Sequence, residues 1–428
     1  MRSKTRKLLV ILITAGLASP VLSVAPSQAT GSTRSDPAVI THWNTIAART
    51  IFTENKTPVP SSGLYFGFVS IAVFDAVVTI EGGYQPYLKQ PRVRGRASSE
   101  AAAATAAYRV LKYYFPTSAR KLTTDYDESL AGIRDGAAKV RGKQVGRAAA
   151  ESLIRSRRDD GRNADVLLTV TPAPGVWRPT PDGPTPNAPM LVPWLGFVRP
   201  LALHSPTQLR LPGPDSIKSN AYARDFAEVK ATGAKDGSNR TPAQTATALF
   251  WTANAVLQYQ MALRDQVTRR GWDIVQSARA FALLGTSTAD ALIACWRAKY
   301  DYAYWRPITA IQLADTDGNR RTQSDPTWTP LAPTPPYPDY VSGHASATGA
   351  ATGVFSYLFG ARSLDLDIAS LVTTTPARHY TRAAALDAET MNARIWLGLH
   401  FRRAMIDANG LGHRAAAWTI GHEFRPSH

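Results

Sequence analysis

Apolar residues recur at helical spacing along most of the chain. Within residues 38–53, Trp43, Ile46 and Ile51 fall on one side of a helix. A second, very apolar helix is predicted over residues 64–80. The same periodicity predicts helices over 99–114, 120–133, 137–157, 243–270 and 274–300. Because no stretch alternates apolar and polar residues as a strand does, the sequence predicts an all-α fold.

Two charged features interrupt this pattern. Asp75 stands between Phe74 and Ala76 in the apolar helix, where a carboxylate is costly unless it is paired. Two roles fit it: a structural hydrogen bond, or support for an active-site arginine. The charged stretch 155–161 has the composition of a solvated helix end.

Residues 172–200 contain nine prolines in 29 positions, which precludes regular structure. They also include Trp177, Trp194 and Phe197, which a disordered linker would avoid. We therefore expect an extended segment that packs across the helices, beside the mouth of a site.

Residues 1–29 have the pattern of a secretory signal peptide: a basic start, an apolar stretch from Leu8 to Ala18, and small residues ending at Ala29. We expect residues 30–428 to form a single all-helical domain, with the proline-rich segment in 30–240 and the candidate chemistry in 241–428. No later stretch looks long and apolar enough to span a membrane. The sequence therefore predicts a soluble, secreted (extracellular) protein.

The formal net charge is +17, which favours anionic substrates or partners. Lysine and arginine are dispersed rather than gathered in a stripe, so we expect no nucleic-acid binding. A single cysteine, Cys295, excludes an internal disulfide and a cysteine metal cluster. Its apolar neighbours predict a buried, structural thiol.

Three stretches carry residues suited to binding an anion. In the first, Lys299 and Arg306 are seven residues apart. On one continuous helix they would return to nearly the same face, two turns apart. Aromatic residues around them predict partial burial, and buried cations need an anion.

The second stretch is Ser342-Gly343-His344, between a proline-rich loop and alanine-rich helical sequence. The free N–H groups of a helix N-terminus make an oxyanion site there, and a histidine can carry a proton near neutral pH. The alternative is a plain serine N-cap.

The third stretch holds Arg394 and His400, six residues apart. They can share a site only if the helix breaks between them, and Gly398 is the expected breaking point. Asp407 lies two helical turns beyond His400, so it can orient that histidine only if His400 precedes the following helix.

Together, Lys-x6-Arg-Pro, Ser-Gly-His and Arg-x5-His resemble the three-part signature of the vanadium-dependent haloperoxidases and type-2 phosphatidic acid phosphatases, in their secreted bacterial haloperoxidase-like branch. The resemblance implies a helical bundle with a proline-rich irregular segment, which binds vanadate, or phosphate at the same site. His400 would ligate vanadium or become phosphohistidine, and His344 would be the acid–base group. The implied oxyanion-binding residues are Lys299, Arg306, Ser342, Gly343 and Arg394.

Other positions bear on which chemistry the resemblance implies. Trp296 and Tyr337 match aromatic positions that flank the family's halide region, although core packing explains them equally well. Ala404 stands where the phosphatases commonly place an aspartate, and Asp407 is then the nearest candidate for that role.

Three functional hypotheses remain open. The first is an exported vanadate-dependent haloperoxidase that oxidises halide with hydrogen peroxide. The second is a soluble exported acid phosphatase that hydrolyses phosphate monoesters through phosphohistidine. The third is a non-catalytic oxyanion-binding helical protein. The absent aspartate at position 404 favours the first over the second, and the oligomeric state is left open.

Overall fold

The computed structural model describes residues 35–427, so the predicted signal peptide lies outside the described residues. Helices build most of the regular structure of this part of the chain. They are α1 (Ala38–Ala48), α2 (Val59–Glu81), α3 (Ser99–Tyr114), α4 (Ala119–Ala131), α5 (Ala137–Ser156), α6 (Asn220–Gly233), α7 (Pro242–Phe250), α8 (Ala255–Arg269), α9 (Ile274–Tyr302), α10 (Pro307–Gln312), α11 (Gly343–Phe359), α12 (Ala383–Trp396) and α13 (Arg402–His422). Shorter elements are the helical turns η1 (Arg49–Glu54), η2 (Pro116–Ser118), η3 (Pro193–Phe197) and η4 (Ala314–Thr316), and strands β1 (Leu366–Ile368) and β2 (Arg378–Tyr380). The predicted all-α class is confirmed.

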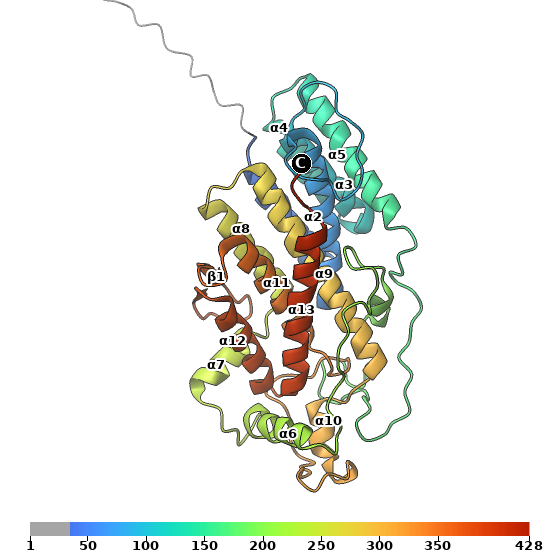
Figure 1. Cartoon of the computed structure of the whole chain (residues 1–428), viewed down its shortest axis with the longest axis vertical. Coiled ribbons are helices and arrows are strands. Elements are labelled where there is room, and N and C mark those ends of the chain that lie inside the picture. The colour runs from blue at the N-terminus through green and yellow to red at the C-terminus, as the bar shows by residue number, and fades with distance from the viewer. Residues whose placement is uncertain (1–34, 428) are drawn as a thin grey trace, which may run out of the picture. The chain divides into compact units, whose positions relative to one another are not determined.

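Helix α9 is the central element of the fold. It begins with a capping box, in which Asp273 accepts a hydrogen bond from Gln276 N (2.8 Å) and Gln276 accepts one from Asp273 N (3.1 Å). Nearly all of its residues are buried, because α2, α11, α13 and η3 all pack against it. Figure 1 shows α13 running beside α9, and α11 packs against both helices. The C-terminal end of α9 is thereby fixed beside the elements that carry the other two candidate stretches.

Two predicted features of the secondary structure are wrong. The helix expected over 243–270 is divided into α7 and α8, because Asn254 caps a new helix by accepting a hydrogen bond from Leu257 N (3.2 Å). The chain also contains a small antiparallel sheet, in which Leu366 pairs with Tyr380. Strands of three residues are too short to show a period of two.

The expectation that no stretch after the signal peptide is long and apolar enough to span a membrane is wrong for α2. By length and composition this helix qualifies, with a mean hydropathy of 1.9 in its most apolar window. However, 83% of that window is buried inside the protein, against α9, α3 and α5. This burial is what the core helix of a soluble protein shows.

The proline-rich segment packs across the helices as predicted. Trp177 is buried, and its backbone N–H donates to Ala303 O beyond the end of α9 (2.7 Å). Leu191 O accepts a hydrogen bond from the indole of Trp296 (3.1 Å). The segment is therefore fastened at two points to the C-terminal end of α9.

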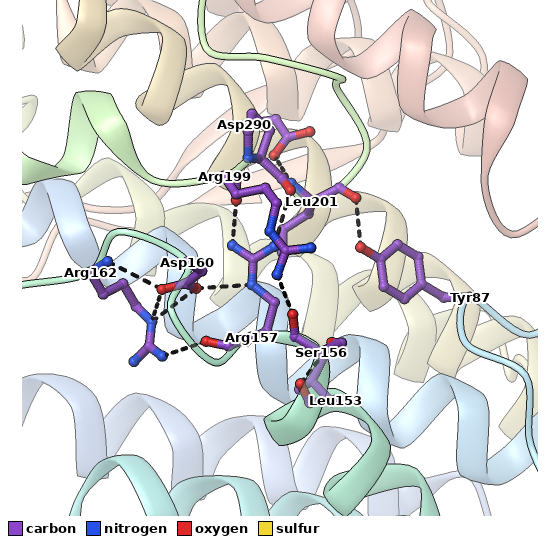
Figure 2. A network of polar contacts seen from close by, with 10 residues as sticks. Tyr87, Leu153, Ser156, Arg157, Asp160, Arg162, Arg199, Leu201 and Asp290 are labelled. Atoms are coloured by element: carbon purple, nitrogen blue, oxygen red, sulfur yellow. Dashed lines mark hydrogen bonds and ion pairs between the residues drawn. The ribbon is translucent and has the colours of Figure 1, made fainter.

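Residues 155–161 differ from the solvated helix end that their composition predicts. Figure 2 shows Arg157 and Asp160 within a polar network. Arg157 Nε donates to Asp160 Oδ2 (2.9 Å), and its Nη1 donates to Pro200 O (3.1 Å). Both side chains are almost fully buried. The network attaches the end of α5 to the C-terminal end of the proline-rich segment.

Buried polar groups elsewhere have structural partners. Asp75 accepts hydrogen bonds from the backbone N–H groups of Tyr87 (2.6 Å) and Leu88 (3.0 Å), which favours the structural interpretation of this carboxylate. Cys295 is buried and its thiol lies 3.2 Å from Val341 O. The predicted structural thiol is confirmed.

Candidate active site

Lys299 and Arg306 contact the same loop, but they do not lie on one continuous helix as predicted. Helix α9 ends at Tyr302, and Arg306 is the residue that precedes α10. Lys299 Nζ donates to Pro338 O (2.6 Å) and Asp339 O (3.1 Å), and Arg306 Nε donates to Tyr337 O (2.7 Å). The loop before Ser342 therefore holds both cations in place.

Ser342 is the N-cap of α11, as predicted. Its hydroxyl accepts a hydrogen bond from Ala345 N (3.4 Å), and Gly343 is the first residue of the helix. His344 follows in the first turn, with its Nε2 3.3 Å from Ala253 O. The backbone N–H groups of Gly343 and His344, at the positive end of the helix, suit the binding of an anion.

The predicted helix break at Gly398 is confirmed. Helix α12 ends at Trp396 and α13 begins at Arg402. Gly398 has φ = +78°, and an added Cβ would lie 2.6 Å from Gly233 O, so only glycine fits this position without strain. The break brings His400 beside Arg306, whose Nη1 lies 3.3 Å from His400 Nε2.

The carboxylate beside His400 comes from Asp339. Its Oδ1 lies 2.7 Å from His400 Nδ1, and both residues are buried. Asp407 instead accepts hydrogen bonds from Tyr340 (2.7 Å) and Arg403 (2.8 Å). The prediction that Asp407 orients His400 is therefore wrong. His400 does precede α13, as that role required, but its ring faces the loop that carries Asp339.

The site has an excess of buried positive charge. Lys299, Arg306 and Arg394 are at most 3% exposed, and none of them forms an ion pair within residues 35–427. Burial, together with neighbouring Arg306, lowers the pKa of Lys299 to about 7. Burial and Arg306 lower the pKa of Arg394 to about 10. An anion among these side chains would offset the cost of burying them.

Unused hydrogen-bonding capacity also favours an oxyanion. Arg394 Nη1 donates to Trp251 O (3.0 Å), but its buried Nε has no partner among the described residues. Residues 35–427 contain no group of three His, Cys, Asp or Glu side chains suited to a bare metal ion. The cations, N–H groups and one histidine gathered here are partners that suit an oxyanion. These residues fit vanadate, and they fit phosphate equally well.

Both histidines are held in the neutral form. Burial, with Arg306 and Lys299, lowers the pKa of His400 well below its usual value of 6.5. Burial and Arg394 do the same to the pKa of His344. A neutral His400 that donates from Nδ1 to Asp339 keeps its lone pair on Nε2. That lone pair faces Arg306 Nη1 at 3.3 Å, and it is the group that a ligand or a nucleophile needs.

A cavity of about 310 Å³ opens beside these residues. Gly343, His344 and Arg394 line it, and so do Trp296 and Tyr337, whose ring centroids are 5.0 Å apart. Pro184 of the proline-rich segment also lines it, as predicted for the mouth of a site. We call Lys299, Arg306, Ser342, Gly343, Arg394 and His400 the oxyanion cradle.

Comparison with known proteins gives sequence relatives of this chain. Residues 279–426 match the family model of the VCPO second helical-bundle domain. Vanadium chloroperoxidase from Curvularia inaequalis is 26% identical over 262 residues, which cover 47% of this chain and 42% of the relative. The match thus spans less than half the length of that relative.

Solved structures share the fold. A bacterial vanadium-dependent iodoperoxidase superposes with a TM-score of 0.76 at 21% identity, covering 91% of this chain and 96% of the other. The holo form of a bacterial vanadium-dependent chloroperoxidase gives 0.67 at 19% identity, covering 85% and 91%. The predicted family resemblance is confirmed at the level of sequence relatives and fold.

Proposed function

We propose that this chain, a vanadium haloperoxidase-like protein by distant homology and fold, is itself a vanadate-dependent haloperoxidase. The observation that carries the proposal is the convergence of Lys299, Arg306 and Arg394 around His400 with no ion-pair partner in residues 35–427. Three buried cations beside a neutral histidine suit an oxyanion that also needs one nitrogen ligand.

Each residue of the cradle has a distinct part in this proposal. The three cations balance the oxyanion's charge, and the Ser342 hydroxyl and Gly343 N–H donate hydrogen bonds to it. His400 Nε2 is the ligand, fixed in orientation by Asp339 at 2.7 Å. Vanadate, when bound, supplies a Lewis-acidic centre that activates hydrogen peroxide for attack by halide.

His344 moves the proton. Its Nε2 lies 3.3 Å from Ala253 O, so an Nε2–H donated to that carbonyl leaves Nδ1 as a free base. Because its pKa is lowered by burial and Arg394, His344 is neutral at neutral pH and ready to accept a proton from peroxide. Trp296 and Tyr337 form the adjoining wall, where we place the halide.

Secretion is part of the same proposal. It rests on the pattern of residues 1–29. Expression of the full-length chain in a secreting host, followed by N-terminal sequencing of the protein in the medium, tests it. A mature end near Ala29 is expected, and retention of an uncleaved chain in the cell would contradict it.

The contact between Asp339 and His400 keeps phosphatase activity as the second candidate. The absence of a carboxylate at position 404 argues against a phosphohistidine mechanism, but Asp339 places a carboxylate on His400 from another direction. A histidine oriented in this way is also a competent nucleophile. A non-catalytic oxyanion-binding protein would share the cradle and lack both activities.

The deciding experiment uses one phosphate-free preparation divided in two, with and without vanadate. Each half is assayed for bromination of a dimedone probe with peroxide and for hydrolysis of an aryl phosphate, beside His400→Ala. Vanadate-dependent bromination that is lost in the variant is the expected result. Hydrolysis inhibited by vanadate, without bromination, would replace the proposal with the phosphatase. Vanadate binding without either activity would replace it with the binding protein.

A further inference from the structure

The chain between α7 and α8 contacts two residues of the candidate site. Trp251 O accepts a hydrogen bond from Arg394 Nη1 (3.0 Å), and Ala253 O lies 3.3 Å from His344 Nε2. Arg394 belongs to α12 and His344 to α11. We call residues 251–253 the carbonyl loop, because its carbonyl groups face a cation of the oxyanion cradle and the histidine beside it.

The direction of the Arg394 side chain depends on this loop. Arg394 is buried, and within residues 35–427 Trp251 O is the hydrogen-bond acceptor of its guanidinium. A guanidinium is planar and its N–H donors form a rigid fork, so a hydrogen bond at Nη1 sets where the remaining donors point. Movement of the carbonyl loop would therefore redirect the donors that Arg394 offers to an oxyanion.

Glu389 fixes the carbonyl loop from a position that does not line the cavity. The indole Nε1 of Trp251, which is buried, donates to Glu389 Oε1 (2.9 Å). The same oxygen accepts hydrogen bonds from the Tyr380 hydroxyl (2.6 Å) and from Arg378 Nη1 (3.0 Å). Arg378 also donates to Thr247 Oγ1 in α7 (3.0 Å). Strand β2 therefore holds both the carboxylate and the helix that precedes the loop.

Helix α12 thus contacts Trp251 at two points. Glu389 and Arg394 both belong to this helix, and they contact the indole and the carbonyl oxygen of the same residue. A buried indole N–H that lost its acceptor would be left without a hydrogen bond away from water, which is costly. Loss of the Glu389 acceptor therefore favours a shift of Trp251, and such a shift moves its carbonyl group away from Arg394.

We propose that Glu389 is a positioning residue of the oxyanion cradle: by holding the Trp251 indole, it keeps Trp251 O where it orients Arg394. This role rests on the proposed function, in which Arg394 balances the charge of the oxyanion. Glu389 touches neither the oxyanion nor a substrate. A carboxylate that served only to pair with Arg378, at 26% and 27% side-chain exposure, would leave oxyanion affinity unchanged.

The test compares two variants that both lack the charge of Glu389. Glu389→Gln keeps an acceptor for the indole N–H, and Glu389→Met has a side chain of similar length without one, so their difference isolates the hydrogen bond. Loss of a direct support behind a metal ligand costs about 10- to 100-fold in affinity. Glu389 acts through a further residue, so we expect vanadate to bind Glu389→Met about fivefold more weakly than Glu389→Gln in calorimetric titration.

Equal vanadate affinities of the two variants, both folded by thermal unfolding, would overturn the proposal. Should Glu389→Met not fold, Glu389→Asp is compared with the wild type instead, since it keeps the charge but withdraws the acceptor from the indole. Weaker binding by Glu389→Asp is then the expected result, and equal binding would overturn the proposal.

A second measurement asks whether the effect passes through Arg394. In an Arg394→Met background, Glu389→Gln and Glu389→Met should bind vanadate equally, because the group that Glu389 positions is gone. A difference that persists there would overturn the proposal. If the wild type binds vanadate but does not brominate dimedone, the proposed function fails and the same comparison still decides the role of Glu389. If it binds neither vanadate nor phosphate, both fail.

Discussion

Asp339 is the residue whose replacement tests the site geometry most directly. Its Oδ1 is 2.7 Å from His400 Nδ1, and within residues 35–427 no other carboxylate pairs with that histidine. Asp339→Ala removes the acceptor but leaves the backbone carbonyl that Lys299 contacts. Asp339→Asn keeps an acceptor at the same place and removes only the charge. The two variants therefore separate orientation from electrostatics.

The size of the effect follows from burial. Asp339 and His400 are 0% and 1% exposed, so the N–H of His400 would lose its partner away from bulk water, at a cost of about 1–3 kcal/mol. Loss of such a support behind a metal-ligating histidine weakens metal affinity by about 10- to 100-fold. Removing a negative charge strengthens anion binding by the cations and reduces this loss. We expect about tenfold weaker vanadate binding in Asp339→Ala and a smaller change in Asp339→Asn.

Vanadate affinity is measured by calorimetric titration, and thermal unfolding confirms that each variant is folded. The expected order of affinity is wild type or Asp339→Asn first and Asp339→Ala last. If folded Asp339→Ala binds vanadate as tightly as the wild type, Asp339 does not position His400 and the assignment of Nε2 as the ligand loses its support.

Three further predictions follow from the described contacts. Because the pKa of Lys299 is lowered to about 7, its ammonium group loses charge as the pH rises above 7. The wild type should therefore lose its advantage in phosphate affinity over Lys299→Met between neutral and alkaline pH, as measured by calorimetry. A ratio of the two affinities that stays constant with pH would contradict this. Gly398→Ala, at φ = +78° and facing Gly233 O, should cost at least about 2 kcal/mol in thermal unfolding, whereas Gly421→Ala, with no atom within 4 Å, should not destabilise the protein. Arg157→Met breaks a buried ion pair and should lower the unfolding free energy, measured by chemical denaturation, by about 3 kcal/mol. The control Arg155→Met changes a side chain that is 58% exposed and should have little effect. If Arg157→Met lowers the unfolding free energy no more than the control does, the network in Figure 2 contributes no stability.

Local sequence patterns predicted most of the helices because these helices follow local rules. The helix predicted over 99–114 has the same bounds as α3, with Ser98 as a side-chain cap. Failures occurred where tertiary contacts decide the outcome. Arg157 and Asp160 lie in a stretch whose composition suits solvent, and their burial depends on carbonyl groups of Arg199 and Pro200, more than 40 residues away.

The predictions for the candidate site likewise succeed for local features and fail for a tertiary contact. Ser342 as a helix cap and Gly398 as a helix break are local features, and both predictions are confirmed. The partner of His400 is not a local feature. Spacing along α13 predicts Asp407 as the partner. In the structure, the helix break at Gly398 turns His400 towards the loop that holds Asp339. The sequence did contain a signal for Asp339 as the partner of His400: it is a carboxylate three residues before Ser342, the start of the Ser-Gly-His motif.

The protonation state of His344 bears on which of the two chemistries this cradle performs. Phosphate-ester hydrolysis needs a protonated group that gives its proton to the leaving oxygen, whereas peroxide activation needs a base that accepts one. Burial and Arg394 lower the pKa of His344, so the neutral base prevails at neutral pH. A bound anionic ligand raises that pKa by opposing Arg394, but burial, the larger cause, persists. The cradle would then support peroxide chemistry at neutral pH and phosphate transfer chiefly under acidic conditions, so the two activities should differ in pH dependence even though they share His400.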